Sequence, residues 1–95
     1  MPEMRFRIRW PDGREEACYS PSLVIKDFFV PGVAYGLADF VARSREALSI
    51  ASDRVKARYG MPCSLAIGQL RHIETAGQAF ATDRDACVAV LAFEE

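Results

Sequence analysis

The chain has 95 residues, of which 51% are hydrophobic and 26% are charged, a composition typical of a globular protein and not of a disordered one. Twelve basic and thirteen acidic residues leave a net charge of −1, which argues against binding nucleic acid or a membrane surface through a sustained basic field. The length predicts a single domain over residues 1–95, with no room for a second core.

The first strand is predicted over residues 4–10, where apolar and basic side chains alternate strictly. Alternate residues of a strand point to opposite faces of the sheet. One face of this strand is therefore apolar and the other basic. The apolar set is Met4, Phe6, Ile8 and Trp10, and the basic set is Arg5, Arg7 and Arg9.

Pro11-Asp12-Gly13 predicts a tight turn after this strand, because proline fits the first turn position and glycine accepts a positive φ. The returning strand is expected over 14–19. A type I turn with a glycine bulge would place Arg9 opposite Glu15. A two-residue Asp-Gly turn would shift that register by one residue, so both pairings remain open at this point.

The segment after the hairpin predicts a short helix over 21–29. Ser20-Pro21 is typical of a helix start, since serine can cap free N–H groups and proline fits the first helical position. A strand over Leu23–Ile25 is the alternative. Pro31-Gly32 ends the segment in either case.

Two longer amphipathic helices are predicted next, each from apolar residues spaced four and three apart. The first ends near Gly60, a plausible C-terminal cap, and the second starts near Ser64. The short break between them predicts an antiparallel helical hairpin. The first stripe is Leu37, Val41, Ser44, Leu48, Ala51 and Val55, and the second is Ala66, Leu70, Ile73, Gly77 and Phe80.

A last strand is predicted over Cys87–Phe93, a continuous apolar run that reads as buried on both faces. The fold class is therefore α+β, with the order β-β-α-α-α-β. We expect a small three-stranded sheet, antiparallel or mixed, in which the last strand pairs with the first. The helical hairpin would cover one face, and the arginines would lie on the other.

The apolar last strand also predicts a homodimer. Helices on one side of a three-stranded sheet would leave the other face in water, and exposed apolar surface of that kind marks an interface. The dimer would form by sheet-face or sheet-edge pairing. The exposed set would be either Val88, Val90 and Ala92, or Cys87, Ala89, Leu91 and Phe93.

The residues carry no catalytic constellation, so the sequence favours a protein that is not an enzyme. Three cysteines with His72 lack metal-ligand spacing, which predicts no metal site and no cofactor. Cys63 precedes a helix N-terminus, but no base is fixed beside it in sequence. We therefore assign no catalytic residue.

Two clusters could bind a ligand or partner. Arg5, Arg7 and Arg9 with Trp10 form either a solvated face with cross-strand ion pairs, the favoured interpretation, or a partner-binding surface. Cys18 and Tyr19 could line a pocket for a small metabolite beside the helical layer. A nucleic-acid role for the arginine strand ranks last, because the net charge is near zero.

The cellular compartment follows from what the chain lacks. No stretch approaches the roughly twenty apolar residues that span a bilayer, and the N-terminus does not resemble a signal peptide. Cys18, Cys63 and Cys87 are odd in number and widely spaced, which suits a reducing compartment. We expect a cytoplasmic protein that binds neither membrane nor nucleic acid.

Four segments resemble a family of small bacterial nitrogen-starvation response proteins: Arg9–Gly13, Cys18–Ser22, Leu37–Arg45 and Ala51–Val55. Members of that family are encoded in gene clusters that contain a nitrilase, together with a radical-SAM protein, an acetyltransferase and flavin-dependent oxidoreductases. The resemblance implies an accessory or interaction protein of bacterial nitrogen metabolism whose partner is an enzyme from the same cluster. The alternative is a small metabolite-binding protein or enzyme of the same pathway.

Overall fold

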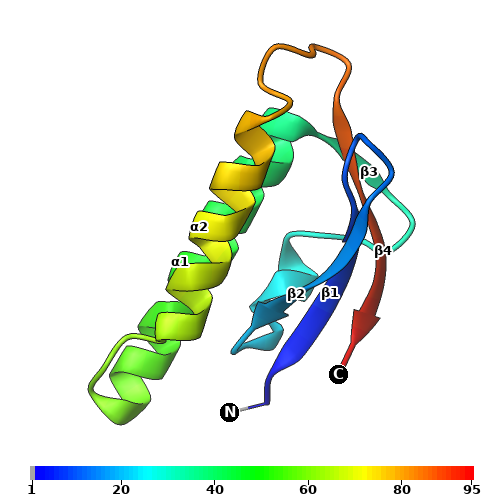
Figure 1. The fold of residues 1–95 in the computed structure, drawn as a ribbon. Coiled ribbons are helices and arrows are strands. Elements are labelled where there is room, and N and C mark those ends of the chain that lie inside the picture. Colours follow the sequence, from blue (N-terminus) through cyan, green and yellow to red (C-terminus); the bar gives the residue numbers. More distant parts are fainter. Residues whose placement is uncertain (1) are drawn as a thin grey trace.

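The strands at the two ends of the chain pair in the middle of a four-stranded antiparallel sheet, and two long helices cover one face of it (Figure 1). The computed structural model describes residues 2–95. The sheet order is β2-β1-β4-β3. The elements are β1 (Met4–Arg9), β2 (Glu15–Ser20), the 3₁₀ helix η1 (Leu23–Asp27), β3 (Ala34–Gly36), α1 (Leu37–Tyr59), α2 (Ser64–Gln78) and β4 (Cys87–Glu94). The α+β class is confirmed, and the expected three-stranded sheet is wrong by one strand.

The β1–β2 hairpin has the register that a glycine-bulge turn predicts. Arg9 lies opposite Glu15, so the shifted alternative is wrong. The Gly13 N–H donates to the Trp10 carbonyl at 2.9 Å, and Gly13 takes a φ of 92°. A side chain is strained at that angle, which explains why glycine stands here.

The short helix after the hairpin is a 3₁₀ helix, and Ser22 caps it in place of Ser20. The Ser22 hydroxyl accepts the Val24 N–H at 3.2 Å. Ser20 instead ends β2, where its hydroxyl donates to the Ser22 carbonyl at 2.7 Å. The strand alternative for Leu23–Ile25 is wrong, because the chain must turn immediately after β2 to cross beneath the helices.

Strand β3 is the element that the sequence did not reveal. It has three residues, so its alternation contains one inward position, Tyr35, between two exposed ones. Its register places Ala34 opposite Ala89 in β4. The buried Tyr35 hydroxyl accepts the Val30 N–H at 2.8 Å, which ties the preceding loop to the sheet. A pattern this short gives no periodic signal.

Helices α1 and α2 form the expected antiparallel hairpin. Gly60 caps α1 with a left-handed φ of 82°, and its N–H donates to the Lys56 carbonyl at 2.7 Å. Gly77 of α2 faces α1 closely, since a Cβ there would lie 3.4 Å from Val41 Cγ2. The hairpin turns its apolar stripes toward the sheet, with Phe40, Leu48 and Ile73 buried.

Strand β4 lies between β1 and β3, as its apolar composition predicts. An irregularity in the β1–β4 register falls between Arg7 and Ile8. Val90 pairs with Ile8 toward the helices, whereas Ala92 pairs with Arg7 on the uncovered side. The first expected set is therefore wrong at Val88 and Val90, which are buried, and the second is right at Cys87 and Ala89 but wrong at Phe93, because the bulge changes the face along the strand. Of the larger side chains, Phe93 packs against the core.

The buried apolar residues form one cluster between the sheet and the helices, with aromatic rings at its centre. Trp10 meets Phe40 edge-on at 5.9 Å between ring centroids and stacks on Phe80 at 6.2 Å. Phe29 stacks on Phe6 at 5.9 Å. Edge-on and offset-stacked rings add to the stability that burial provides. This rigid layer leaves the opposite face of the sheet free to display its side chains.

Candidate partner-binding face

Arg5, Arg7 and Arg9 stand on the face of the sheet away from the helices. Strand β1 alternates buried and exposed residues along its whole length, with the three arginines exposed. Because β1 lies between β2 and β4, the three arginines form a row along a central strand of the sheet. The predicted basic face of this strand is confirmed. We call this outer side of the four strands the arginine face.

Carboxylates on neighbouring strands partner two of the arginines. Arg9 Nη2 lies 3.0 Å from Glu15 Oε2 of β2, and Arg7 Nε lies 3.9 Å from Glu94 Oε1 of β4. All four side chains are well exposed, and such ion pairs contribute about 0–1 kcal/mol each. A partner could therefore replace these glutamates at little cost. The pairing also offsets the positive field that nucleic acid would require.

Small residues surround the arginine row. Ala17 and Ala92 lie opposite Arg7 on its two sides, and Ala89 lies opposite Arg9. Methyl groups beside long guanidinium side chains make a shallow surface from which the arginines project. Such a surface suits contact with another protein better than enclosure of a small molecule.

Tyr19 extends the arginine face at the end of β2. Its ring lies under the Arg5 guanidinium, 5.7 Å from centroid to Cζ, and its hydroxyl donates to Glu3 Oε2 at 3.0 Å. Partial burial and the Glu3 carboxylate raise the pKa of Tyr19 to about 12. The hydroxyl therefore stays a neutral hydrogen-bond donor at physiological pH.

Trp10 lies in the core and not beside the arginines. The side chain is 2% exposed and packs between Phe40 and Phe80. Its position continues the inward set of β1, because residues 4, 6, 8 and 10 share one face. Trp10 can support the sheet from beneath, but it does not contact a molecule that docks on the arginine face.

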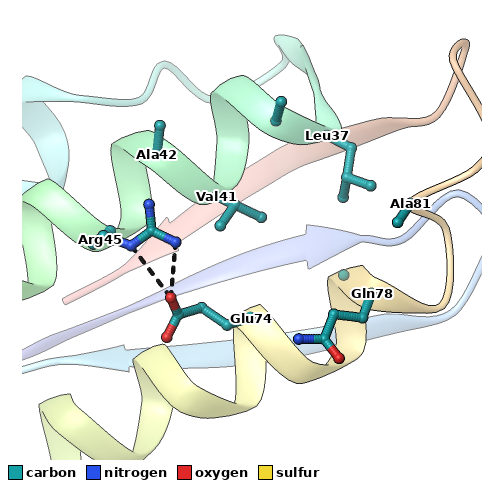
Figure 2. Close-up of a pocket in the computed structure, with 9 residues that line it drawn as sticks. Leu37, Val41, Ala42, Arg45, Glu74, Gln78 and Ala81 are labelled. Atoms are coloured by element: carbon teal, nitrogen blue, oxygen red, sulfur yellow. Dashed lines mark hydrogen bonds and ion pairs between the residues drawn. The ribbon is translucent and has the colours of Figure 1, made fainter.

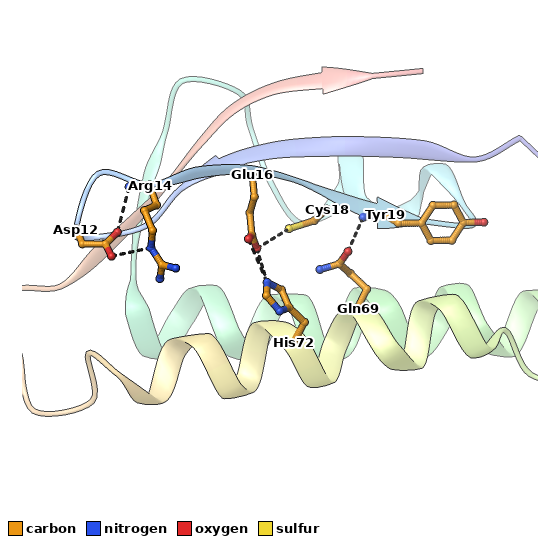
Figure 3. Close-up of polar contacts among 7 residues, drawn as sticks. All are labelled: Asp12, Arg14, Glu16, Cys18, Tyr19, Gln69 and His72. Carbon is orange, nitrogen blue, oxygen red and sulfur yellow. Dashed lines mark hydrogen bonds and ion pairs between the residues drawn. The ribbon is translucent and has the colours of Figure 1, made fainter.

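Cys18 is also buried, and its thiol is poorly suited to nucleophilic chemistry. Burial raises the pKa of Cys18 far above its usual range, and the Glu16 carboxylate raises it further. The thiol donates to Glu16 Oε1 at 3.9 Å (Figure 3). Cys18 and Tyr19 are consecutive on β2, so they point to opposite faces and do not converge on the predicted pocket.

A contact between Glu16 and His72 joins β2 to α2, and sequence reasoning missed it. His72 Nε2 lies 2.8 Å from Glu16 Oε1 and 3.1 Å from Oε2 (Figure 3). The Glu16 carboxylate also accepts a hydrogen bond from the Cys18 thiol, so the histidine and the thiol both contact the same carboxylate. In a Cys–His nucleophile the imidazole must reach the thiol itself. The geometry is thus that of a structural tie.

Gln69 occupies the outer edge of β2. Its side-chain oxygen accepts the Tyr19 N–H at 2.9 Å (Figure 3). That backbone group points away from β1 and would otherwise be free to pair with another strand. The contact therefore occupies one of the backbone groups through which this edge could pair with another strand.

A groove of about 440 Å³ runs between α1 and α2 on the side away from the sheet (Figure 2). Leu37 and Val41 contribute apolar surface to it. Its charged groups already pair, since both Arg45 nitrogens Nε and Nη2 donate to Glu74 Oε2, at 3.2 and 2.8 Å. The groove is open to solvent and holds no pair of convergent free polar groups among these lining residues.

Across residues 2–95, no group of three or more His, Cys, Asp or Glu side chains could hold a metal ion. Neither helix in that range is long and apolar enough to cross a bilayer.

Comparison with protein families gives one match, over residues 5–93. The family is described as nitrogen starvation-induced protein NitG. Comparisons with curated proteins and with solved structures gave no match. The matched range contains the whole arginine row and all four strands, apart from Met4 of β1 and Glu94 of β4.

Proposed function

The chain belongs to the NitG family of nitrogen starvation-induced proteins, and we propose that it is a non-enzymatic interaction protein whose arginine face binds a protein partner. The observation that carries the proposal is a sheet with one packed face and one open face. The open face displays Arg5, Arg7, Arg9 and Tyr19 above alanines. Arginine and tyrosine are enriched among the residues that dominate binding energy at protein interfaces.

The partner is a protein of the same gene cluster, made under the same nitrogen limitation. The family resemblance supports this choice, since members of the resembled family are encoded beside a nitrilase and its accompanying enzymes. The exposed ion pairs support it physically. Arg7 and Arg9 can accept carboxylates of a partner in addition to those of Glu94 and Glu15, because each guanidinium has five N–H donors.

The side chains best suited to catalysis are engaged in structural roles, which supports a non-enzymatic protein. Glu16 receives both His72 and the Cys18 thiol, and the pKa of Cys18 is raised by burial. Three free cysteines support a reducing, cytoplasmic location.

Co-purification from nitrogen-starved cells tests the partner. The tagged wild type and two variants are compared: Arg7→Glu, which reverses the central charge of the arginine face, and Arg84→Glu, a matched reversal in an exposed loop. An enzyme of the cluster should be enriched with the wild type and with Arg84→Glu, and lost with Arg7→Glu. Equal recovery with all three proteins, or no cluster enzyme with any of them, would overturn the proposal.

We also propose that, when no partner is bound, two copies of the chain pair through this face as a homodimer. The face carries Glu15 and Glu94 beside its arginines, so it is complementary to itself, as a two-fold interface requires. Pairing through the edge of β2 is disfavoured by the Gln69 contact with Tyr19.

Sedimentation velocity tests the dimer. The wild type and the control Ala38→Glu, which alters an exposed residue of α1, should sediment at twice 10.6 kDa. Ala92→Glu, on the arginine face, should sediment as a monomer. A wild type that stays at 10.6 kDa at high micromolar concentration would refute the dimer and leave the partner proposal standing.

A further inference from the structure

The turn between α1 and α2 differs in charge from the rest of the chain. Residues 54–73 contain no aspartate and no glutamate, although the whole chain has thirteen acidic residues. The same segment carries Arg54, Lys56, Arg58 and Arg71, which are four of the twelve basic residues. Asp53 and Glu74 border this segment, and Lys56 and Arg58 are the cations nearest the turn. We call the turn with the helix ends beside it, residues 56–67, the hairpin tip.

The hairpin tip also carries most of the large apolar side chains that meet solvent. Tyr59 is 63% exposed, Met61 72%, Leu65 64% and Ile67 39%. Among residues 2–95, the other exposed large apolar residues are Val30 and Val33, which lie in the loop before β3. Apolar side chains gathered at one place on a small protein mark a site of interaction.

The shape of the molecule presents this tip to a partner. Every residue from Lys56 to Pro62 is exposed. Helix α1 has 23 residues, a length of about 34 Å, whereas the six residues of β1 span about 20 Å. The turn accordingly lies at the free end of the hairpin (Figure 1). Behind it, a groove of about 370 Å³ continues between the helices. Lys56 and Arg71 line this groove together with Asp53 and Glu74, so its charges balance and the excess of cations lies at the turn itself.

We propose that the hairpin tip is a second docking site, which inserts into an apolar pocket of a protein partner ringed by carboxylates. Charge complementarity carries this choice, because the exposed cations Lys56 and Arg58 stand beside the turn and attract an acidic surface. Met61 and Leu65 would enter the pocket, and Lys56 and Arg58 would face its acidic rim. Tyrosine, methionine and arginine are residue types enriched at the centres of such interfaces.

The geometry favours a protein over an anionic membrane. A helix that binds a membrane surface lies in the plane of the bilayer with an apolar face along its length. Here both helices end at the site and keep their apolar faces against the sheet. The tip is about two helix diameters wide, which is a footprint of roughly 20 Å suited to a pocket.

Photo-crosslinking in nitrogen-starved cells tests the inference. Met61 is replaced by p-benzoyl-phenylalanine, and the crosslinked peptides are sequenced by mass spectrometry. Val30, which is 57% exposed and lies outside the tip, carries the same probe in the matched control. We expect the Met61 probe, and not the Val30 probe, to label one protein at a peptide with net negative charge and apolar residues. The double variant Lys56→Glu/Arg58→Glu should reduce that yield about tenfold or more.

Three outcomes would overturn the inference. The labelled peptide could lack carboxylates, it could come from a second copy of this chain, or the yield could be unchanged by the double variant. A vesicle arm tests the membrane alternative: co-sedimentation with phosphatidylglycerol vesicles that the double variant abolishes would assign the tip to lipid. Arg7→Glu should leave the Met61 crosslink intact, so failure of the arginine face and failure of the tip are separable. Circular dichroism confirms that each variant folds.

Discussion

Replacing Ser44 by alanine should stabilise the protein. Ser44 is fully buried in α1, and its hydroxyl has no hydrogen-bond partner within residues 2–95. A buried hydroxyl without a partner costs about 1–3 kcal/mol relative to water. Alanine is also the better helix former by about 0.5 kcal/mol. Because the methyl group that remains keeps most of the side-chain volume, we expect the free energy of unfolding to rise by about 1–2 kcal/mol.

Ser52 provides the matched control for this substitution. It lies two turns later on the same helix and is also buried, but its hydroxyl accepts the Cys63 N–H at 3.3 Å. Ser52→Ala removes a hydrogen bond worth about 1 kcal/mol while gaining the same helix propensity. The net change should be a small loss of stability or none.

Thermal and urea unfolding followed by circular dichroism measure both variants. For a chain of this size, 1 kcal/mol shifts the Tm by about 4–8 °C, so Ser44→Ala should melt at a clearly higher temperature. A lower Tm for Ser44→Ala would refute the reasoning, because it would mean that the hydroxyl has a partner. Equal shifts for the two variants would refute it as well, since only helix propensity would then be acting.

Three further predictions concern single residues. With a thiol-specific disulfide reagent at neutral pH, exposed Cys87 should react fast. Buried Cys18 should react only after denaturant is added, because burial both hides its thiol and raises its pKa. The native Cys18→Ser variant should therefore react at the same rate as the wild type, and loss of a fast phase in this variant would contradict the prediction. The difference in ultraviolet titration between wild type and Tyr19→Phe should show that Tyr19 ionises with a pKa of about 12. Because this folded-state pKa lies above the ordinary value of 10.0, the stability that Tyr19 contributes is present below pH 10 and is lost as pH rises toward 12. A midpoint near 10.0 would show that burial and the Glu3 contact do not raise the pKa of Tyr19. Gly60→Ala should lower the free energy of unfolding by about 1 kcal/mol, since a φ of 82° strains alanine, and urea unfolding that matches the wild type would disprove this.

The elements with dense local signals could be predicted from the sequence. Seven alternating residues specify β1 and the faces of its arginines, and Gly13 selects the hairpin turn. Gly60 and the apolar spacing locate the end of α1. In each case the information lies within a few residues of the feature, where backbone sterics and side-chain periodicity act directly.

Features that depend on contacts between distant residues could not be predicted from the sequence. Strand β3 forms because β4 offers a free edge, not because three residues favour a strand. The Glu16–His72 contact joins positions 56 residues apart, and neither neighbourhood signals it. The bulge that turns Ala92 outward and Phe93 inward depends on the pairing of β4 with β1. As a result, the partner-binding set named from sequence mixed surface residues with Trp10 and Cys18, which belong to the core.

The side chain of Gln69 has a consequence for how the protein behaves in a crowded solution. Exposed strand edges are the usual starting points for cross-β aggregation, because free N–H and C=O groups recruit further strands. Here Gln69 takes the Tyr19 N–H on one border of the sheet, and on the other border β3 has only three residues to offer. The Gln69 contact therefore hinders strand addition at the outer edge of β2, and Gln69→Ala would leave the Tyr19 N–H open to another strand.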